Sequence, residues 1–430
     1  MHLARIFKNS FCKFYFSIAI LLTVSLTITA NGVKLPQHTN SLTIVQKFYR
    51  MNQEKLYWFS TPEKIERAKE WLNIIESGNS LGIVPNKHLI NQLRTALDEY
   101  KTPLKSISTM KSDWQISAMV LNFIKTLQQG NIHFEYDEIN VSRDSVYVNQ
   151  LLEMNMTVAK IVSKLDCVDA DYLVLKKYLQ DSLTTNDTFK LKTVIVAMNY
   201  RRYLTINHQA EYILINIPKT EADYFRNDTL QIHMRIVVGK KSTPTPIFAS
   251  YITSIVTFPN WNVPHSIAVN EILPKVKRHS DYLEQHNLDV VDKQGESIED
   301  ADLNWKEYNT KNFPYFFRQS TGAGNALGVL KFNLRNPFSI FLHATSWQGV
   351  FEKDYRFRSH GCIRLEKPFE LAKNILRGKI DMEELRQGKI NTKPQKLEPP
   401  QKIPVFIIYM PLMVKEGKIT FLPDVYELIK

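Results

Sequence analysis

Hydrophobic positions recur with the period of a helix through the first half of the chain. Between Trp114 and Leu127 the apolar residues follow a 3.6-residue spacing, and the run stops at Gly130. Thr61 is a capping residue followed by Pro62, which favours a helix that begins there and continues to about residue 75. The same period predicts further helices over 86–99, 145–164, 168–183 and 187–199.

From about residue 208 the period changes to two, which is typical of strands with one buried face. The run 230–238 alternates apolar and polar residues and ends at a glycine. We therefore predict an α+β fold, in which an all-helical domain precedes a β-rich domain. The predicted strands are 211–217, 230–238, 247–258, 328–334, 338–343, 405–409 and 419–422, with one helix at 368–376.

A polar segment from about His265 to Asn325 interrupts the predicted strands. Inserts of this length inside a compact domain are usually functional lids or disordered segments. Helical patterning over 266–283 favours a lid, so we expect residues 265–325 to be a mobile helical cap and not a separate folded domain.

Residues 1–30 have the pattern of a secretory signal peptide. Arg5, Lys8 and Lys13 precede a mostly apolar run, and Ala30 is a small residue at a plausible cleavage point. The alternative is an uncleaved anchor, although the apolar run is shorter than the ~20 residues that span a bilayer. Both alternatives place the rest of the chain outside the cytoplasm, and we expect a periplasmic protein. An uncleaved segment would be its one route to membrane association.

The chain is basic, with a formal net charge of +12 at pH 7, but its cations are dispersed. No basic block or nucleic-acid motif occurs, so nucleic acid is not an expected partner. A dispersed positive surface suits an anionic polymer or membrane surface, and equally an ordinary soluble surface.

Three cysteines occur, and only Cys362 lies in a recognisable motif, Ser359-His360-Gly361-Cys362. Cys12 falls in the signal segment, and Cys167 is expected to be a small buried hydrophobic residue. A disulfide between Cys167 and Cys362 is disfavoured by their different settings. His343 ends the alternating run 338–343, where a strand could hold its imidazole at a fixed edge.

These residue types suit a cysteine nucleophile. A free cysteine is mostly protonated at neutral pH, so it needs a base or a cation beside it, and His343 is the candidate base. Gly361 allows the backbone N–H groups of Gly361 and Cys362 to approach a substrate oxygen, with His360 as a further donor. The same residues could hold a metal, but a fourth ligand at an expected spacing is missing, so no metal and no cofactor are predicted.

The motif and its surroundings resemble the L,D-transpeptidases with a YkuD-type catalytic domain. The similarity covers roughly residues 205–425 and extends, more weakly, to the helical region before it. It is closest to the scaffold-bearing, YcbB-like murein transpeptidases, although the small peptidoglycan-binding module of that branch has no room here between Ser182 and Leu191. The resemblance rests on His343 and 359–362, together with 236–239, 245–246, 259–264, 272–274, 325–328 and 342–345.

The resemblance implies a signal peptide at 1–30, a helical scaffold domain at 31–200 and a sandwich-like catalytic domain at 205–425. It implies a role in peptidoglycan biosynthesis, cell wall organisation and cell shape. Cys362 would attack the third-residue carbonyl of a stem tetrapeptide and expel D-alanine, and an amine would then resolve the thioester into a 3–3 crosslink. Ala344 would act only through its carbonyl. Arg364, Ser359, Trp261 and Asn325 would contact the substrate, while Arg364 could equally form an internal salt bridge.

Other functions stay open at this stage. Water in place of the amine gives an L,D-carboxypeptidase, and attack on a murein–lipoprotein amide gives a hydrolase with the same cysteine and histidine. A non-catalytic wall-binding protein is the remaining alternative, but such a protein has no need for a matched thiol and imidazole. The sequence does not distinguish the acceptors, because they share Cys362 and His343.

Overall fold

The computed structural model describes residues 27–29, 32–34, 40–100, 107–139, 145–184, 187–322, 324–389 and 392–430. Most of the predicted signal segment lies outside these ranges, so its cleavage stays a prediction. The first described elements are two short paired strands, β1 Thr27–Thr29 and β2 Gly32–Lys34. No helix among the described residues is long and apolar enough to cross a membrane.

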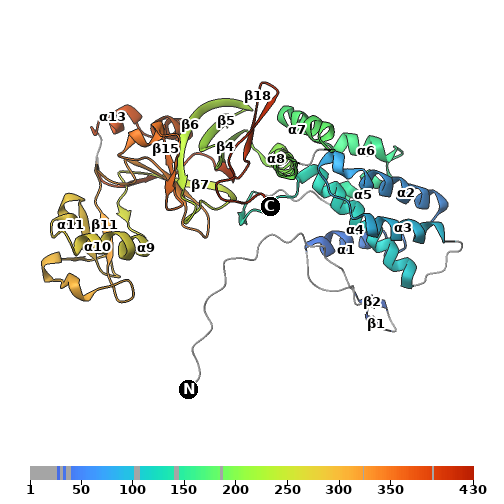
Figure 1. Ribbon diagram of the computed structural model, residues 1–430, viewed down its shortest axis with the longest axis horizontal. Coiled ribbons are helices and arrows are strands. Elements are labelled where there is room, and N and C mark those ends of the chain that lie inside the picture. Colours follow the sequence, from blue (N-terminus) through green and yellow to red (C-terminus); the bar gives the residue numbers. More distant parts are fainter. Residues whose placement is uncertain are drawn as a thin grey trace, which may run out of the picture.

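Helices α1 to α6 enclose the hydrophobic core of the first domain, at one end of an elongated molecule (Figure 1). Thr61 caps α2 by accepting a hydrogen bond from the Lys64 N–H, as its sequence predicts. The predicted stretch 145–164 is two helices, because Thr157 caps a new one. The helices are α1 Asn40–Met51, α2 Pro62–Glu76, α3 Lys87–Asp98, α4 Ile107–Gln129, α5 Ser145–Glu153 and α6 Val158–Leu165.

Two further helices, α7 Ala170–Asp181 and α8 Thr188–Asn207, connect the helical domain to the β-rich domain. The hairpin of β18 Leu412–Lys415 and β19 Lys418–Phe421 packs on them, and Leu412 lies fully buried against α7 and α8. Helix α8 ends at Asn207, and only three residues separate it from the first strand of the β-rich domain. The described chain between α7 and that strand therefore contains no additional module.

The strands of the β-rich domain form a path that closes on itself. Along the path the order is β12-β13-β15-β6-β5-β4-β17-β7, and β7 pairs again with β12. The predicted α+β succession is confirmed, but the β-rich part is closer to a barrel than to an open sandwich. Its strands are β4 Glu211–Asn216, β5 Glu221–Arg226, β6 Thr229–Gly239, β7 Phe248–Thr257, β12 Leu330–Leu334, β13 Phe341–His343, β15 Ile363–Leu365 and β17 Ile403–Ile408.

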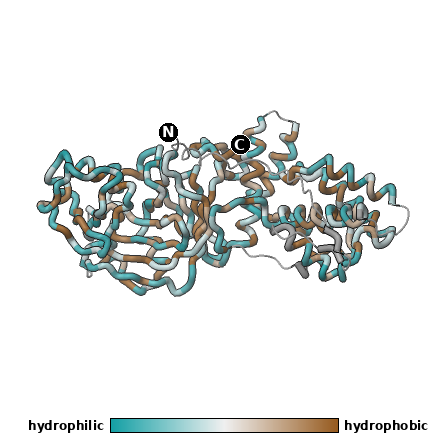
Figure 2. Tube along the Cα trace, turned by 90° about the horizontal axis from the view of Figure 1, so that it is seen from below, coloured by the Kyte–Doolittle hydropathy of each residue, from teal (hydrophilic) through white to brown (hydrophobic). Residues whose placement is uncertain are grey.

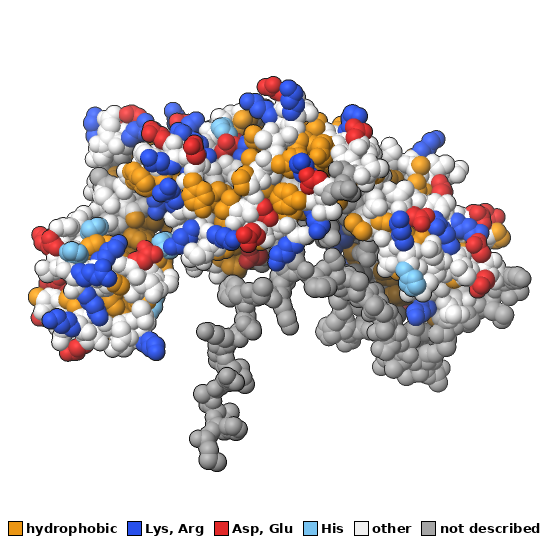
Figure 3. Space-filling model, in the orientation of Figure 1, with side chains coloured by type: hydrophobic (Ala, Val, Ile, Leu, Met, Phe, Trp, Pro, Cys, Tyr) orange, Lys and Arg blue, Asp and Glu red, His pale blue; other side chains and the backbone are white. Residues whose placement is uncertain are grey.

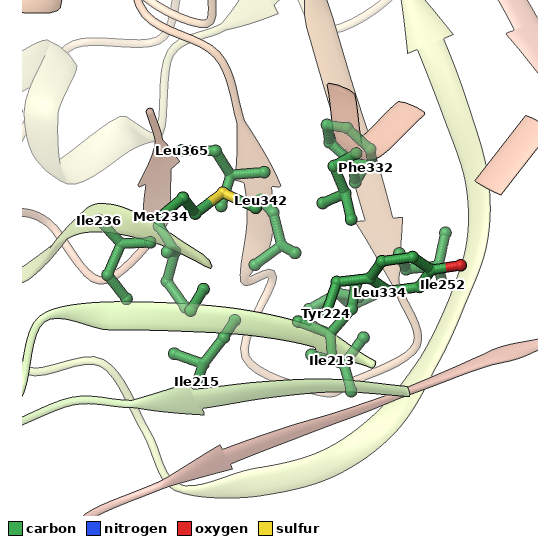
Figure 4. Close-up of a cluster of buried hydrophobic side chains, with 14 of the residues drawn as sticks. Ile213, Ile215, Tyr224, Met234, Ile236, Ile252, Phe332, Leu334, Leu342 and Leu365 are labelled. Atoms are coloured by element: carbon green, nitrogen blue, oxygen red, sulfur yellow. The ribbon is translucent and has the colours of Figure 1, made fainter. Parts of the chain in front are cut away.

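The barrel core consists of the inward-facing residues of these strands. Side chains from β4, β5, β6, β7, β12, β13 and β15 point toward one another in Figure 4, and hydrophobic segments run through the middle of the molecule in Figure 2. Helix α12 Pro368–Leu376, which has its predicted bounds, and α13 Met382–Arg386 cover this core. Shorter strands β3 Tyr136–Asp137 and β16 Gln395–Leu397 pair with β7, and β14 Phe357–Ser359 pairs with β6.

The predicted helical lid is a folded unit of mixed structure. Residues 261–319, called the insert below, contain the four-stranded antiparallel sheet β10-β9-β11-β8 and a hydrophobic core of their own. The expectation of a helical cap without separate folding is therefore wrong. Apolar residues such as Phe313 and Phe317 are scattered along a polar sequence, and they form a common core only when the strands of the insert pair. In Figure 1 the insert projects from the barrel on the side away from the helical domain.

The insert begins and ends with paired strands, which bring its two ends together. Its elements are β8 Trp261–Asn262, α9 His265–Ile267, the π-helical turn η2 Ala268–Ile272, α10 Leu273–Val276, α11 Tyr282–Gln285, β9 Leu288–Val291, β10 Ser297–Ile298 and β11 Phe316–Gln319.

Candidate active site

Adjacent strands carry a row of polar side chains on the face turned away from the barrel core. Lys331 of β12 lies opposite His343 of β13, and His343 lies opposite Arg364 of β15. On the next strand, the apolar Val237 of β6 lies opposite Arg364, so the polar row ends there. Because side chains alternate between the faces of a strand, the neighbouring Leu342 points into the core, as Figure 4 shows. The register of the three strands therefore places Lys331, His343 and Arg364 side by side on one face.

Cys362 lies in a tight turn, residues 359–362, between β14 and β15, which both pair with β6. Gly361 has φ of +115°, and a Cβ there would lie 3.0 Å from Ile340 Cδ1. Ser359 Oγ donates to the Cys362 carbonyl at 2.6 Å and accepts from the Gly361 N–H at 3.1 Å. The turn thus needs glycine and a small hydroxyl residue beside the cysteine.

A second loop, residues 239–246, packs against the turn and holds it by hydrogen bonds. Thr245 Oγ1 donates to the Gly361 carbonyl at 2.7 Å and accepts from the Gly239 N–H at 2.9 Å. The hydroxyl of Tyr426 donates to the Gly239 carbonyl at 2.5 Å. A Cβ on Gly239 would lie 2.2 Å from the Thr243 carbonyl oxygen, so the loop closes only around glycine. Thr245 is a positioning residue.

The Cys362 thiol is half-buried and lies against the β12–β13 hairpin. Its Sγ is 3.8 Å from the Ser339 carbonyl oxygen. Burial raises the pKa of the Cys362 thiol, while the Phe341 backbone N–H and the positive charges of Lys331 and Arg364 oppose that shift. The resting cysteine is therefore a protonated thiol at neutral pH and needs a base in order to react.

His343 has the properties of that base. Its side chain is 5% exposed, and its Nδ1 lies 2.6 Å from the Ala344 carbonyl oxygen. Since a carbonyl only accepts, Nδ1 holds the proton of the neutral ring and Nε2 carries the lone pair. Ala344 thus contacts the imidazole through its backbone carbonyl, the group through which it was expected to act. Burial lowers the pKa of His343 to about 3, and Arg364 and Lys331 add to this lowering, so the imidazole is neutral at pH 7.

No hydrogen bond joins the Cys362 Sγ to the His343 imidazole in the part of the chain that the structure describes. The two residues are nevertheless held on neighbouring strands, since His343 pairs with Arg364, two residues beyond Cys362. Catalytic hydrogen bonds are often long before substrate binds. The structure thus places an uncharged thiol and an uncharged imidazole on neighbouring segments of the same sheet.

Lys331 is a site residue that the sequence reasoning missed. It is half-buried, its Nζ lies 4.1 Å from the centroid of the Phe341 ring, and burial lowers its pKa. Lys331 and His343 stand on opposite sides of the turn at Asn336, whose side-chain oxygen accepts from the Phe338 N–H at 3.0 Å. Recognising 328–334 and 338–343 as one hairpin would have placed the lysine beside the histidine.

Two of the expected substrate contacts have protein partners instead. The Asn325 side chain is buried, donates to the Pro259 carbonyl at 3.1 Å and accepts from the Leu327 N–H at 2.8 Å, so it fastens the end of the insert to the barrel. The Ser359 hydroxyl is committed to the turn, and it also takes the Gly361 N–H that was expected to face an oxyanion. These corrections follow from burial, which the sequence pattern does not show.

The remaining predicted residues link the turn to the insert. The imidazole of His360 is partly exposed, with Nε2 2.6 Å from Glu271 Oε1 of η2. Trp261 packs against the core of the insert. Arg364 makes no salt bridge among the described residues, which removes the alternative of an internal ion pair.

Cys167 is a free, buried cysteine between α6 and α7, and its Sγ lies 3.4 Å from Thr205 Oγ1. It belongs to a hydrophobic cluster with Tyr172 and Leu175, and burial raises its pKa. Cys362 is also free, so the two cysteines form no disulfide. Over the described ranges, no cluster of three or more His, Cys, Asp or Glu residues is arranged to hold a metal ion.

Two family models match the two described domains. Residues 210–390 match the L,D-transpeptidase catalytic domain, YkuD, and residues 43–179 match a scaffold domain. The matched catalytic domain is that of an acyltransferase-type enzyme. The chain therefore contains an L,D-transpeptidase catalytic domain together with a scaffold domain.

A relative from Haemophilus influenzae, a "Putative L,D-transpeptidase", is 32% identical over 68% of this chain, and the chain spans 58% of its length. A variant L,D-transpeptidase of Enterococcus faecium is 13% identical, covers 47% of this chain and 50% of its own, with a TM-score of 0.24. L,D-transpeptidase 3 from Mycobacterium tuberculosis is 12% identical over 46% of this chain and 61% of its own, with a TM-score of 0.23. Similarity at this structural level says nothing about the site.

Proposed function

We propose that the protein is a peptidoglycan L,D-transpeptidase in which Cys362 is the nucleophile and His343 the general base. The observation that carries this proposal is the pair of neutral groups: a protonated thiol in a glycine turn, and a buried imidazole whose Nδ1 is fixed on the Ala344 carbonyl. A neutral imidazole accepts a proton at neutral pH, and the thiol supplies it.

In the first half-reaction, His343 Nε2 takes the Cys362 proton and the sulfur attacks the third-residue carbonyl of a stem tetrapeptide. The carbonyl electrons move to oxygen, and the Cys362 N–H is the donor that we assign to this oxyanion. When the carbonyl re-forms, the bond to D-alanine breaks and its amine takes the proton from His343. The products are a thioester on Cys362 and free D-alanine.

In the second half-reaction, an amine of another stem attacks the thioester, His343 accepts a proton from this amine, and the sulfur leaves as a thiol after taking that proton back. The product is a 3–3 crosslink. Water in place of the amine gives a carboxypeptidase, and attack on a murein–lipoprotein amide gives a hydrolase. The contact of the insert with the turn, between Glu271 and His360, supports the transpeptidase, because an insert held over the turn would exclude water and favour the amine.

We further propose that His360 supports the turn and that Arg364 binds substrate, whereas Ser359 and Asn325 position the backbone. Peptidoglycan lies outside the cytoplasm, so the predicted signal at 1–30 and the proposed substrate agree on a periplasmic location. The scaffold domain at 43–179 adds no group to the row of Lys331, His343 and Arg364.

Mass spectrometry of the products made from a purified stem tetrapeptide tests the function. A 3–3 dimer with released D-alanine is expected, and a tripeptide alone would instead establish the carboxypeptidase. Cys362→Ala should remove both product and covalent adduct, while Cys167→Ala, which changes the other described cysteine, should leave both. Product formation by Cys362→Ala would overturn the assignment of the nucleophile.

A further inference from the structure

The row of Lys331, His343 and Arg364 contains two cations, and no carboxylate of the described residues pairs with either of them. The charges that shift the pKa values of Cys362 and His343 are those of Lys331 and Arg364, and no carboxylate acts on any of these four groups. Neither cation forms an ion pair with a described residue, and Arg364 Nε is buried without a hydrogen-bond partner. The site thus holds two half-buried positive charges that protein groups do not neutralise.

Such an arrangement is costly unless an anion joins it, because burying a charge without a partner loses its hydration. Other cations of this protein are paired with carboxylates, such as Arg235 with Glu366 and Lys176 with Asp166 at 2.5 Å, while the buried Arg202 donates to the Leu81 carbonyl and the Tyr172 hydroxyl. Burial lowers the pKa of both Lys331 and Arg364, in keeping with the missing partner. The anion that would compensate them must come from a ligand.

The strand register indicates where the ligand's anion lies. Lys331 and Arg364 flank His343 on the two neighbouring strands, and adjacent strands are about 4.8 Å apart. In the proposed reaction the leaving amine must approach His343, which protonates it. The nearest carboxylate to that amine is the one on the same leaving residue, a single Cα away, when that residue ends the peptide.

We propose that Lys331, together with Arg364, binds the C-terminal carboxylate of the residue that is expelled, which makes Lys331 a residue that determines the affinity for the donor. This inference rests on the proposed function and deepens it by naming the feature of the donor that is recognised. Lys331 is the new binding residue, held on the site face by its contact with the Phe341 ring. Donors extended by a further residue, or amidated at the terminus, lack the carboxylate at this position and are poor substrates.

The test compares a stem tetrapeptide with its C-terminal amide. Equilibrium binding of both is measured on Cys362→Ala protein, and kcat/KM for acylation is measured on the native enzyme. A charge-assisted contact of this kind predicts that the acid is favoured over the amide about 10- to 100-fold in both measurements. Lys331→Met should reduce this preference to a few-fold by weakening the acid alone, and Lys331→Arg should restore most of it.

Lys402→Met is the matched control, because Lys402 also lies over an aromatic ring, that of Tyr251 at 5.6 Å, but outside the site. This variant should keep the full preference for the acid. Thermal unfolding of each variant verifies that it is folded. Equal binding of acid and amide to the Cys362→Ala protein, including no binding of either, overturns the proposal.

The proposal is also overturned if Lys331→Met lowers kcat/KM for acylation equally for the acid and the amide donor. The lysine would then act on the thiol and not on the carboxylate of the donor. The proposed transpeptidation fails separately, if the native enzyme forms no acyl-enzyme with the tetrapeptide. In that case the binding measurement on the Cys362→Ala protein still decides whether the two cations recognise the carboxylate.

Discussion

At the scale of single residues, the thiol and the imidazole of this site are both uncharged at rest. Burial works against the charged form of each group, and Lys331 and Arg364 disfavour the imidazolium further while they favour the thiolate. A preformed ion pair between Cys362 and His343 is therefore not the resting state. In the proposed reaction the proton must therefore move from the thiol to His343, as it does to a general base.

Replacing His343 should change how stability depends on pH. Its pKa is about 3 in the folded protein and 6.5 when unperturbed, so between these pH values the unfolded chain binds a proton that the folded chain does not. Stability therefore rises with pH across this window, by up to about 1.4 kcal/mol per pH unit, and is fully regained above pH 6.5. His343→Gln should remove this contribution.

Urea unfolding of both proteins at pH 4, 5, 6 and 7 measures the difference. The free energy of unfolding of the native protein should fall more steeply toward acid than that of His343→Gln, because titration of the other groups is common to both. Parallel curves would mean that the imidazole has the same pKa in the folded and the unfolded protein, which would contradict the lowered pKa of the buried His343.

At the scale of elements, the turn 359–362 depends on a backbone conformation that favours glycine. Gly361→Ala should destabilise the protein by roughly 3 kcal/mol, since its φ of +115° strains an alanine and its Cβ would press on Ile340. Acylation of Cys362 should fall strongly in the same variant. The free energy of unfolding and the rate of adduct formation measure the two effects.

Gly378→Ala is a control that separates the effect of backbone strain on stability from the effect of a close contact of the new Cβ. Gly378 also has a positive φ, of +85°, but a Cβ there would meet nothing within 4 Å. This variant should lose only about 1 kcal/mol and keep full acylation. A similar loss of stability in both variants would show that the contact with Ile340 is unimportant.

The insert is predicted to control which acceptor reaches the thioester. Glu271→Gln removes the carboxylate that contacts His360, so the insert should cover the turn less often and water should enter. The ratio of tripeptide to crosslinked dimer should rise severalfold, while the rate of Cys362 acylation should persist. Glu284→Gln, an exposed change on α11 of the same insert, is the control and should leave the ratio unchanged.

Shortening the insert should raise the ratio of tripeptide to crosslinked dimer further than Glu271→Gln does. Loss of acylation in a shortened but folded variant would mean that the insert builds the site itself. An unchanged ratio in Glu271→Gln, with native acylation, would mean that the contact with His360 does not hold the insert over the turn.

At the scale of the whole molecule, the scaffold and the barrel share hydrophobic clusters. Tyr203 of α8 packs on Phe406 of β17, with ring centroids 6.1 Å apart, and Leu412 of β18 is buried against α7 and α8. The domains should therefore unfold together. On the face drawn in Figure 3, lysine and arginine side chains are interspersed with acidic ones over both domains and the insert, which fits the dispersed charge of the sequence.

Phe406→Ala tests this coupling. It should cost about 3–5 kcal/mol, because the ring is fully buried, and it should divide one calorimetric transition into two. Leu93→Ala removes a buried side chain of the scaffold core alone and should lower the stability without dividing the transition. Two transitions already present in the native protein would contradict the expected coupling.

The sequence by itself determined the helices, the longer strands and the chemistry of the site. Hydrophobic period and caps are local signals, so α2 at Thr61 and α12 at 368–376 could be predicted. The motif 359–362 with His343 identified the family, which the comparisons confirm. Strand β5 was missed because only Ala222 and Tyr224 of its six residues are buried, too few for a clear alternation.

Only the tertiary structure decided what depends on strand pairing and burial. The β7–β12 pair closes the barrel, and the register of β12, β13 and β15 places Lys331 beside His343. The fold also buries Ser359 and Asn325, which changes them from expected substrate contacts into positioning residues. Contacts between residues far apart in the chain leave no periodic trace in a single sequence, and the pKa of an imidazole follows its surroundings, so these properties arise only in the folded molecule.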